Sequence, residues 1–307
     1  MKVLILGGLG FIGRAVVSRL NLEHEITIVD VRAPARGEVP PEVKVKTGNV
    51  IDVDFLHQIM REGFPVVVHL VGLPSVRECE CKRFTSYRLN YLSTARVLEA
   101  MKVSGIRKLV FASTALVYGL RKSMKPISED ETPRPRTLYG QHKFLSEELI
   151  REYARRGEVE AVILRLFNVY GRSPKEAKDV LSIWLRNSLQ GKPILVRIGD
   201  FRDFIHVRDV AEIILRTLAL DLSEERLLIL NVGSGKALRM EEVADLFLKH
   251  FPDLEIYYEE GQGLGLRADI SKVQQILHFK PICPEKGIKM YITEFLGRMG
   301  HETRIRC

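Results

Sequence analysis

Short apolar runs alternate with longer amphipathic stretches through the first half of the chain. The runs are continuous, which predicts strands buried on both faces, and the stretches between them predict helices. Strands alternating with helices in this way indicate a parallel sheet covered by helices on both faces. We expect strands at residues 2–6, 24–29, 43–46, 65–70, 108–112 and 159–166, and helices at residues 14–20, 52–61, 84–104 and 139–156.

The second half of the chain is less regular. Its pattern predicts helices at residues 179–190, 210–220, 240–250, 271–277 and 285–298, and strands at residues 193–198, 227–232 and 254–258. The predicted fold class is α/β, with a doubly wound parallel sheet of Rossmann type and a smaller C-terminal α/β cap that binds substrate. We expect a first domain at residues 1–170, with residues 203–233 returning to it, and a second domain at residues 171–307.

The composition is that of a soluble globular enzyme. Hydrophobic residues make up 46% and charged residues 28% of the 307 residues, which is ordinary for this class. No apolar run approaches the roughly 18 residues of a transmembrane helix, so we expect no membrane partner. The chain enters its first strand directly and leaves no room for a signal peptide, which predicts a cytoplasmic protein.

Charge and cysteine usage add two further expectations. The net charge is +8, but basic and acidic residues are interspersed and no basic block carries interleaved aromatic residues, so no nucleic-acid partner is expected. Cys79 and Cys81 are separated by one residue, and no matching Cys/His pair stands elsewhere. Zinc-ligand pairs usually have two or more intervening residues, so we expect reduced thiols and no metal.

A glycine-rich turn separates the first predicted strand from the first predicted helix. Gly7, Gly10 and Gly13 are spaced by three and three residues, and Phe11 and Ile12 lie between the last two. Glycines let the turn tighten and let backbone N–H groups approach a pyrophosphate, while the helix N-terminus supplies partial positive charge. The turn also has the strand and the helix that a dinucleotide-binding turn requires. We therefore expect the first domain to bind a dinucleotide.

An acidic residue, Asp30, closes the second predicted strand. A carboxylate at this place accepts hydrogen bonds from an adenosine ribose and repels a 2′-phosphate, which favours NAD over NADP. Arg32 and Arg36 follow closely and could accept a phosphate, so tolerance of NADP stays open.

Tyr139 and Lys143 are candidates for acid–base chemistry. A spacing of four residues puts them on one face of a helix, one turn apart. A free phenol has a pKa near 10, and a neighbouring ammonium together with a positively charged nicotinamide favours the phenolate. Such a tyrosine could take a proton from a sugar hydroxyl while hydride leaves the same carbon. A bare Tyr-x-x-x-Lys pattern is also common by chance on amphipathic helices.

Ser113 and Thr114 follow a predicted buried strand, where small hydroxyl residues would sit at the mouth of the sheet. Thr114 is the favoured donor to a substrate oxygen, and Ser113 is its close competitor. A loop threonine that satisfies only local backbone groups is the plainer interpretation.

Together these motifs resemble the extended short-chain dehydrogenase/reductase superfamily. The glycine turn, Ser113-Thr114 and Tyr139-x-x-x-Lys143 occur in the order typical of that superfamily, followed by Arg-Leu-Phe-Asn-Val-Tyr-Gly at residues 165–171 and Arg-Asp-Phe-Ile-His-Val-Arg-Asp at residues 202–209. The resemblance runs to about residue 295. Within the superfamily the chain most resembles nucleotide-sugar epimerases of the UDP-glucose 4-epimerase type.

The resemblance implies roles for individual residues. Tyr139 would be the acid/base, Lys143 would hold the ribose and lower the pKa of Tyr139, and Thr114 would bind the reacting oxygen. The implied cofactor-binding residues are Gly7, Gly10, Phe11, Ile12, Gly13, Asp30, Asn49, Val50, Leu70, Val71, Gly72, Asn90, Tyr139 and Lys143. The implied substrate-binding residues are Thr114, Tyr139, Asn168, Arg202 and Arg267, of which Asn168 and the two arginines would hold the sugar-nucleotide diphosphate.

Some positions depart from the family pattern. Asn49 stands where many relatives carry an aspartate that contacts adenine, although its carbonyl can still bind the amino group of the base. Ala115 and Leu116 follow Thr114, where the related 4,6-dehydratases carry an acidic pair that expels a hydroxyl. This difference argues against dehydration.

The sequence therefore predicts an NAD-dependent epimerase that inverts C4 of a UDP-hexose, UDP-glucose or UDP-galactose, through a transient 4-keto sugar. An NAD(P)-dependent sugar-nucleotide reductase or dehydrogenase is the alternative, and a non-catalytic NAD- or RNA-binding protein is a distant third. Relatives often form homodimers through the helices placed here at residues 84–104 and 139–156, so we also expect a homodimer.

Overall fold

The computed structural model describes residues 1–172 and 179–305. Within these residues one parallel sheet has seven strands in the order β10-β6-β5-β4-β1-β2-β3. This sheet confirms the predicted Rossmann-type α/β fold. Its strands are β1 (Lys2–Leu6), β2 (Glu25–Asp30), β3 (Lys44–Thr47), β4 (Val66–His69), β5 (Lys108–Thr114), β6 (Glu160–Leu166) and β10 (Leu227–Val232).

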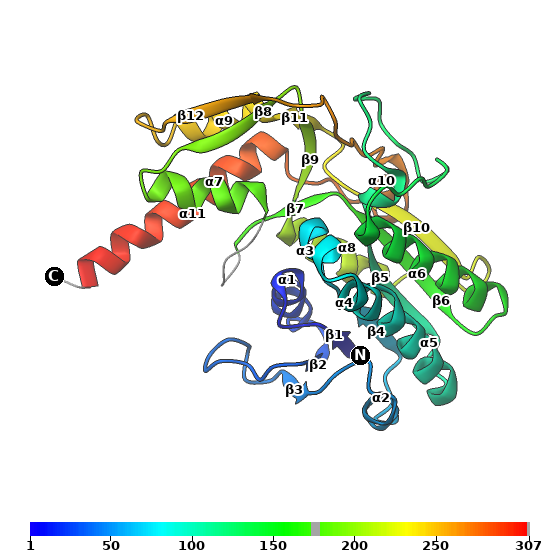
Figure 1. Cartoon of the computed structure of the whole chain (residues 1–307). Coiled ribbons are helices and arrows are strands. Elements are labelled where there is room, and N and C mark those ends of the chain that lie inside the picture. The colour runs from blue at the N-terminus through cyan, green and yellow to red at the C-terminus, as the bar shows by residue number, and fades with distance from the viewer. Residues whose placement is uncertain (173–178, 306–307) are drawn as a thin grey trace.

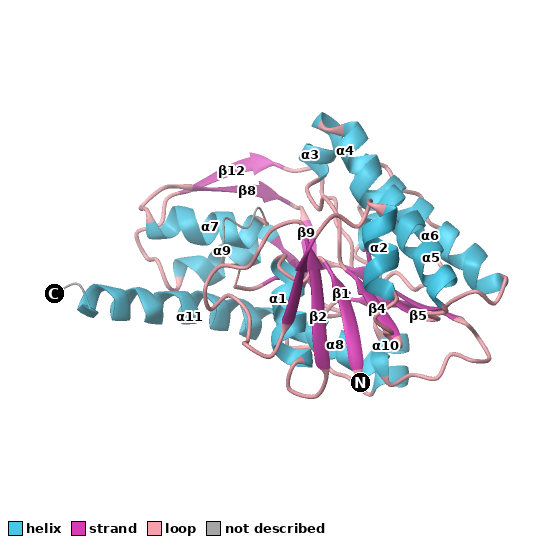
Figure 2. Ribbon diagram, turned by 90° about the horizontal axis from the view of Figure 1, so that it is seen from below, coloured by secondary structure: helices cyan, strands magenta, loops and turns pink. Residues whose placement is uncertain are grey.

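Successive residues of each strand point to opposite faces of this sheet, so the strands place apolar side chains on both faces. Helices cover both of these faces. Val3 and Ile5 of β1 belong to the apolar core under α1 (Phe11–Leu20), α8 (Val207–Leu218) and α10 (Ser271–Leu277). Leu4 and Leu6 belong to the opposite core. That core lies under α2 (Val53–Met60), α5 (Ser93–Ser104) and α6 (Leu138–Arg155), and Figure 2 shows the sheet between these two layers.

The strand order reverses between β1 and β4, because the chain builds outward through β2 and β3 and then returns to the other side of β1. In open parallel sheets such a reversal leaves a crevice at the carboxyl ends of the two strands. The glycine turn follows β1, and the loop of residues 70–73 follows β4. The topology thus brings both loops to the place where a dinucleotide would lie.

A third apolar core lies beyond the carboxyl edge of the large sheet (Figure 1). Trp184, Phe204, Phe247 and Tyr291 are buried in it. Its strands are β7 (Asn168–Tyr170), β8 (Ile194–Ile198), β9 (Phe201–His206), β11 (Ala237–Arg239) and β12 (Ile256–Glu260), and its helices are α7 (Val180–Leu189), α9 (Met240–Leu248) and α11 (Pro284–Ile305). In the described residues β11, β9 and β7 form one small sheet and β12 and β8 another.

The predicted helix at residues 84–104 is confirmed, with a π turn inside it. It consists of α4 (Arg83–Tyr87), a π-helical turn η1 (Arg88–Leu92) and α5. The π turn contains Asn90, whose side chain is fully buried and bonds the loop after β4. A wider turn of this kind inserts an extra residue into a helix and is frequent at functional sites.

Other differences concern short elements and boundaries. The helix α3 (Val76–Cys81), capped by Ser75, and the short strands β7, β9 and β11 were not expected. Ser113 and Thr114 lie inside β5 and are followed by the 3₁₀ turn η2 (Ala115–Tyr118), whereas the sequence placed them after the strand. No helix in the described part of the chain is long and apolar enough to cross a membrane.

Candidate active site

The glycines of the turn after β1 leave little space for added side chains. Gly7 has φ +84°, a conformation that glycine adopts without strain. A Cβ on Gly13 would lie 2.4 Å from the carbonyl oxygen of Gly7, so the start of α1 packs directly on the turn. Gly10 is the N-cap of α1 and has no side chain to occupy the first N–H groups of the helix. With Phe11 and Ile12 in the first turn, this site fits the pyrophosphate of a dinucleotide.

We expect Gly13→Ala to remove the bound dinucleotide. The added methyl group must push α1 away from the turn, and overpacking of this kind costs about 1–3 kcal/mol of stability. The nucleotide content of the purified protein measures the effect. Gly297→Ala is the matched control, because Gly297 is an exposed residue of α11 with no atom within 4 Å of the added Cβ. Retention of the nucleotide by Gly13→Ala would contradict this assignment.

The residues predicted to hold adenosine lie at the ends of β2 and β3. The carboxylate of Asp30 accepts a hydrogen bond of 3.0 Å from the backbone N–H of Leu9 in the glycine turn. Asn49 is exposed, and its Oδ1 accepts from the N–H of Ile51 at 3.0 Å, while Val50 is buried. The Oδ1 atom of Asn49 is therefore shared with the backbone. The amide nitrogen of Asn49 takes no part in this hydrogen bond.

The loop after β4 connects the glycine turn to the catalytic candidates. A Cβ on Gly7 would lie 3.1 Å from the backbone nitrogen of Val71, so Leu70 and Val71 pass close to the turn. A Cβ on Gly72 would lie 2.8 Å from Oδ1 of Asn90 and 3.5 Å from Nζ of Lys143. Only a residue without a side chain fits between these groups.

Asn90 holds this loop in place. Its Oδ1 accepts from the N–H of Leu73 at 2.8 Å, and its Nδ2 donates to the carbonyl of Leu73 and to Oγ of Ser86, both at 3.2 Å. The side chain is thus committed to protein groups, and in this structure Asn90 acts on the predicted diphosphate site by positioning residues 70–73.

Lys143 is buried at the centre of the site. Its Nζ donates to the carbonyl of Ala112 at 2.8 Å and lies 4.5 Å from the ring centroid of Phe111. Burial lowers the pKa of Lys143 to about 8. Burial and the nearby Lys143 charge lower the pKa of His69 to about 3, so His69 is neutral and Lys143 is the cation beside the loop after β4.

Tyr139 lies one helical turn before Lys143 on α6. Burial raises the pKa of Tyr139, the charge of Cys79 raises it further, and the hydrogen bond with Thr114 lowers it. The protein side chains alone therefore keep this phenol protonated. The lowered pKa expected from Lys143 and a nicotinamide stays a prediction for the complex with cofactor.

Ser113 and Thr114 face different partners. The Ser113 hydroxyl donates to Glu147. Thr114 lies at the end of β5, and its hydroxyl accepts from the N–H of Leu116 at 3.3 Å. Because the one proton of Ser113 is held by Glu147, the geometry favours Thr114 as the hydroxyl that meets a substrate.

The predicted diphosphate ligands lie on the cap side of the crevice. Asn168 begins β7, and its Nδ2 donates to the carbonyl of Asp203 at 3.1 Å. Arg202 on β9 donates from Nη1 to the carbonyls of Phe201 and Leu264, both at 2.8 Å. The side chain of Arg202 is 26% exposed, and its Nη2 lies 3.7 Å from Oδ2 of Asp200.

Arg267 is held in a similar way, with its Nε donating to the carbonyl of Gly235 at 2.9 Å. Asp203 is fully buried. It fixes the loop that contains Gly235 and the loop that contains Arg267. Its carboxylate accepts from the N–H of Ser234 at 2.7 Å, of Gly235 at 3.1 Å and of Ala268 at 2.9 Å. The two predicted cations are therefore anchored through backbone carbonyls, with guanidinium groups that a diphosphate can pair with.

Residues 3–233 match the model of a protein family described as the NAD dependent epimerase/dehydratase family. The match spans well over half of the 307 residues. The protein belongs to this family. Its membership confirms the predicted resemblance, and NAD is confirmed as the cofactor of the family.

Relatives of this NAD-dependent enzyme match its sequence or its fold along nearly the whole chain. A protein of Methanocaldococcus jannaschii described as a putative UDP-glucose 4-epimerase is 32% identical, over 94% of this chain and 97% of its own. A UDP-N-acetyl-alpha-D-glucosaminuronate decarboxylase of Bacillus cytotoxicus is 30% identical, over 96% and 97%. The solved structure of MoeE5 in complex with UDP-glucuronic acid and NAD superposes with a TM-score of 0.86 at 28% identity, over 97% and 100%.

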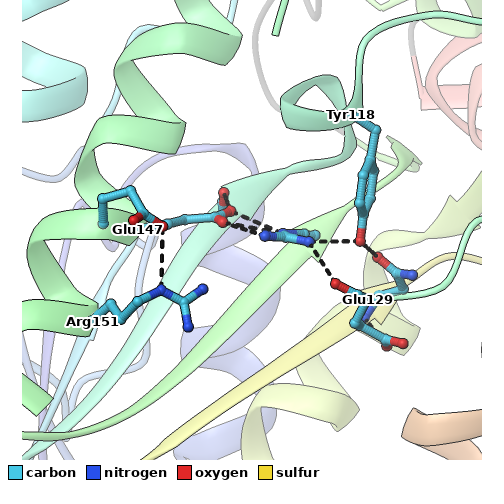
Figure 3. Close-up of polar contacts among 8 residues, drawn as sticks. Tyr118, Glu129, Glu147 and Arg151 are labelled. Carbon is cyan, nitrogen blue, oxygen red and sulfur yellow. Dashed lines mark hydrogen bonds and ion pairs between the residues drawn. The ribbon is translucent and has the colours of Figure 1, made fainter. Parts of the chain in front are cut away.

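A buried polar network behind the site of this epimerase/dehydratase was missed in the sequence. Glu147 and Arg165 form an ion pair of 2.7 Å, with side chains 0% and 2% exposed. Arg165 also donates to the hydroxyl of Tyr118 at 2.8 Å, and that hydroxyl donates to Oδ1 of Asn231 at 2.8 Å (Figure 3). Through Ser113 the network reaches the strand end that carries Thr114.

One signal in the sequence could have revealed this pair. Glu147 follows Lys143 by four residues on the same helix face, and Arg165 interrupts an apolar strand. A charged residue at a core position is rarely buried without a partner, so Glu147 and Arg165 could have been expected to pair with each other.

Burial also raises the pKa of Tyr118 to about 12, which keeps its hydroxyl protonated as the donor to Asn231.

The described residues include no group of three or more His, Cys, Asp or Glu side chains that could hold a metal ion. Cys79 is buried, and Cys81 and Cys283 are exposed free thiols.

Proposed function

We propose that this enzyme inverts C4 of a UDP-hexose and interconverts UDP-glucose and UDP-galactose. The observation that carries this proposal is the buried Lys143, whose Nζ binds the carbonyl of Ala112 in β5 at 2.8 Å, one helical turn after Tyr139. The 32% identity to the putative UDP-glucose 4-epimerase of M. jannaschii supports the choice of substrate.

In the proposed reaction Tyr139 takes the proton of the C4 hydroxyl, and Thr114 holds the reacting oxygen by a hydrogen bond. Gly7, Gly10 and Gly13 would hold NAD, whose nicotinamide would supply hydride transfer to and from C4. Lys143 holds positive charge beside the phenol, while Asn168, Arg202 and Arg267 grip the diphosphate so that the sugar itself can turn. A protonated Tyr139 then returns its proton to the oxygen on C4.

The residues after Thr114 argue against dehydration. Ala115 is buried and Leu116 is half-buried, and neither can protonate a leaving hydroxyl. A UDP-uronic acid decarboxylase is the second candidate, because the 30% identity to the Bacillus cytotoxicus decarboxylase covers 96% of this chain.

Conversion of UDP-galactose without added cofactor tests the proposal. Purified enzyme should form UDP-glucose with no net absorbance of reduced nicotinamide, because an epimerase leaves its NAD oxidised after each cycle. Release of carbon dioxide from a UDP-uronic acid would instead identify the decarboxylase. Stoichiometric formation of reduced nicotinamide would identify a dehydrogenase, and absence of any conversion would overturn the epimerase.

We further propose that the enzyme is a homodimer. Apolar side chains stand exposed on the outer surface of α4 and α6, with Phe84 70%, Tyr87 39% and Leu145 48% exposed. Phe84 stacks on Tyr87 at a centroid distance of 6.5 Å, which extends this surface along the helix. Exposed apolar groups gathered in this way are typical of subunit contacts.

Phe84→Glu is expected to produce a monomer, because it places a charge in the centre of this apolar surface. Light scattering after size exclusion measures the molar mass. Leu22→Glu is the control, since Leu22 is 75% exposed in the turn between α1 and β2 and should leave the dimer intact. A Phe84→Glu protein with the mass of the dimer would contradict this interface.

A further inference from the structure

Two arginines lie beside the predicted ribose site and clasp the glycine turn. Arg14 belongs to α1 and Arg32 follows β2. Their Nε and Nη2 atoms, respectively, donate to the carbonyl of Leu9 at 3.0 Å each. The N–H of the same Leu9 donates to Asp30. Both guanidinium groups therefore stand next to the carboxylate at which the adenosine ribose is expected.

A single acidic residue, Glu38, holds both arginines. Its carboxylate pairs with Arg32 through two hydrogen bonds, Nη1 to Oε2 at 2.8 Å and Nη2 to Oε1 at 2.5 Å. It also pairs with Arg14. The N–H of Ala35 donates to Oε2 at 2.6 Å, and the side chain of Glu38 is only 8% exposed. The hydrogen bond from Arg32 is the main reason that the pKa of Glu38 falls to about 2, so the carboxylate stays charged at any physiological pH.

This arrangement matters for the choice between NAD and NADP. The two nucleotides differ by a 2′-phosphate on the adenosine ribose, and planar guanidinium groups are the side chains best suited to bind it. The site holds two such groups, but Glu38 occupies the donors of Arg32 and pairs with Arg14. Asp30 and Glu38 carry two negative charges against the two positive charges of Arg14 and Arg32, so these four groups together offer a phosphate no net positive charge.

We propose that Glu38 determines the cofactor specificity of this enzyme by withholding Arg14 and Arg32 from a 2′-phosphate. The inference rests on the proposed placement of the ribose at Asp30. In this arrangement two carboxylates with different roles exclude NADP. Asp30 repels the phosphate directly, and Glu38 removes the cations that would otherwise attract it.

The test measures dissociation constants of NAD and NADP for full-length protein freed of nucleotide on charcoal. Asp30→Asn alone should leave NADP weak, since both arginines stay paired. The Asp30→Asn/Glu38→Gln double variant should improve the ratio of NADP to NAD affinity by about 100-fold over Asp30→Asn, because each freed charge-assisted hydrogen bond supplies about tenfold or more. Adding Arg32→Met to the double variant should remove most of this gain.

Glu23→Gln is the matched control. Glu23 pairs with Arg19 of α1 at 2.7 Å on the surface, and its loss should leave the ratio unchanged. NAD affinity of each variant reports whether the site is still folded. The role of Glu38 is overturned, and the proposed function is not, if the double variant binds NAD but has the same ratio of NADP to NAD affinity as Asp30→Asn. Wild-type protein that binds NAD and NADP equally has the same consequence. Wild-type protein that binds no NAD overturns the proposed function together with the role of Glu38.

Discussion

Tyr139→Phe is expected to lower kcat for interconversion of UDP-glucose and UDP-galactose by about 1,000-fold, within the range that general acid–base catalysis contributes. The phenyl ring fills the same space but can neither take nor return the proton of the C4 hydroxyl. Initial rates with both sugar nucleotides, measured at saturating substrate, give the change in kcat.

Tyr153→Phe is the matched control for this variant. Tyr153 lies on the same helix, α6, and its hydroxyl bonds Glu99 away from the site, so the same atom is removed without touching the chemistry. Its kcat should equal that of the unaltered enzyme. A Tyr139→Phe enzyme with kcat within a few-fold of Tyr153→Phe would show that another group moves the proton.

Glu147→Gln is expected to lower the free energy of unfolding by about 3–5 kcal/mol, since breaking a buried ion pair leaves the other charge uncompensated. Arg165 is 2% exposed and would keep its charge next to a neutral amide. The amide nitrogen also adds donors where Arg165 and Ser113 both need an acceptor. Urea unfolding followed by circular dichroism measures the difference.

The adjacent residue gives the control. Glu148 pairs with Arg151 on the surface of α6, with side chains 47% and 48% exposed. Exposed pairs contribute about 0–1 kcal/mol, so Glu148→Gln should change stability by no more than that. Equal effects of the two substitutions would contradict a role for the buried pair, whereas partial recovery in Glu147→Gln/Arg165→Met would support it.

The parts of the fold that the sequence predicted have local signals. The apolar runs of β1, β2, β4, β5 and β6 are continuous, and Gly7, Gly10 and Gly13 mark the turn at which β1 passes into α1. The conformations of these strands and of the glycine turn depend on residues close in the sequence. The parallel arrangement of the strands follows from their burial on both faces. This is why the sheet and the glycine turn could be predicted without the structure.

The parts that were missed depend on contacts between distant segments. The π turn η1 forms where Asn90 reaches Leu73, a contact that no periodicity in residues 84–104 reveals. Glu147 and Arg165 belong to different elements, so each looks like an ordinary charged residue until burial is known. Arg32 was interpreted as a possible phosphate ligand because its partner, Glu38, is visible only in the folded loop.

The most direct test of the proposed reaction follows the hydrogen on C4. UDP-galactose carrying deuterium at C4 is incubated with the purified enzyme, and the product is examined by mass spectrometry and proton NMR. An enzyme that removes and returns the same hydride yields UDP-glucose with deuterium still at C4 and releases no labelled reduced nicotinamide. UDP-glucose that has lost the label, or label recovered in free reduced nicotinamide, would contradict inversion at C4 within one closed site.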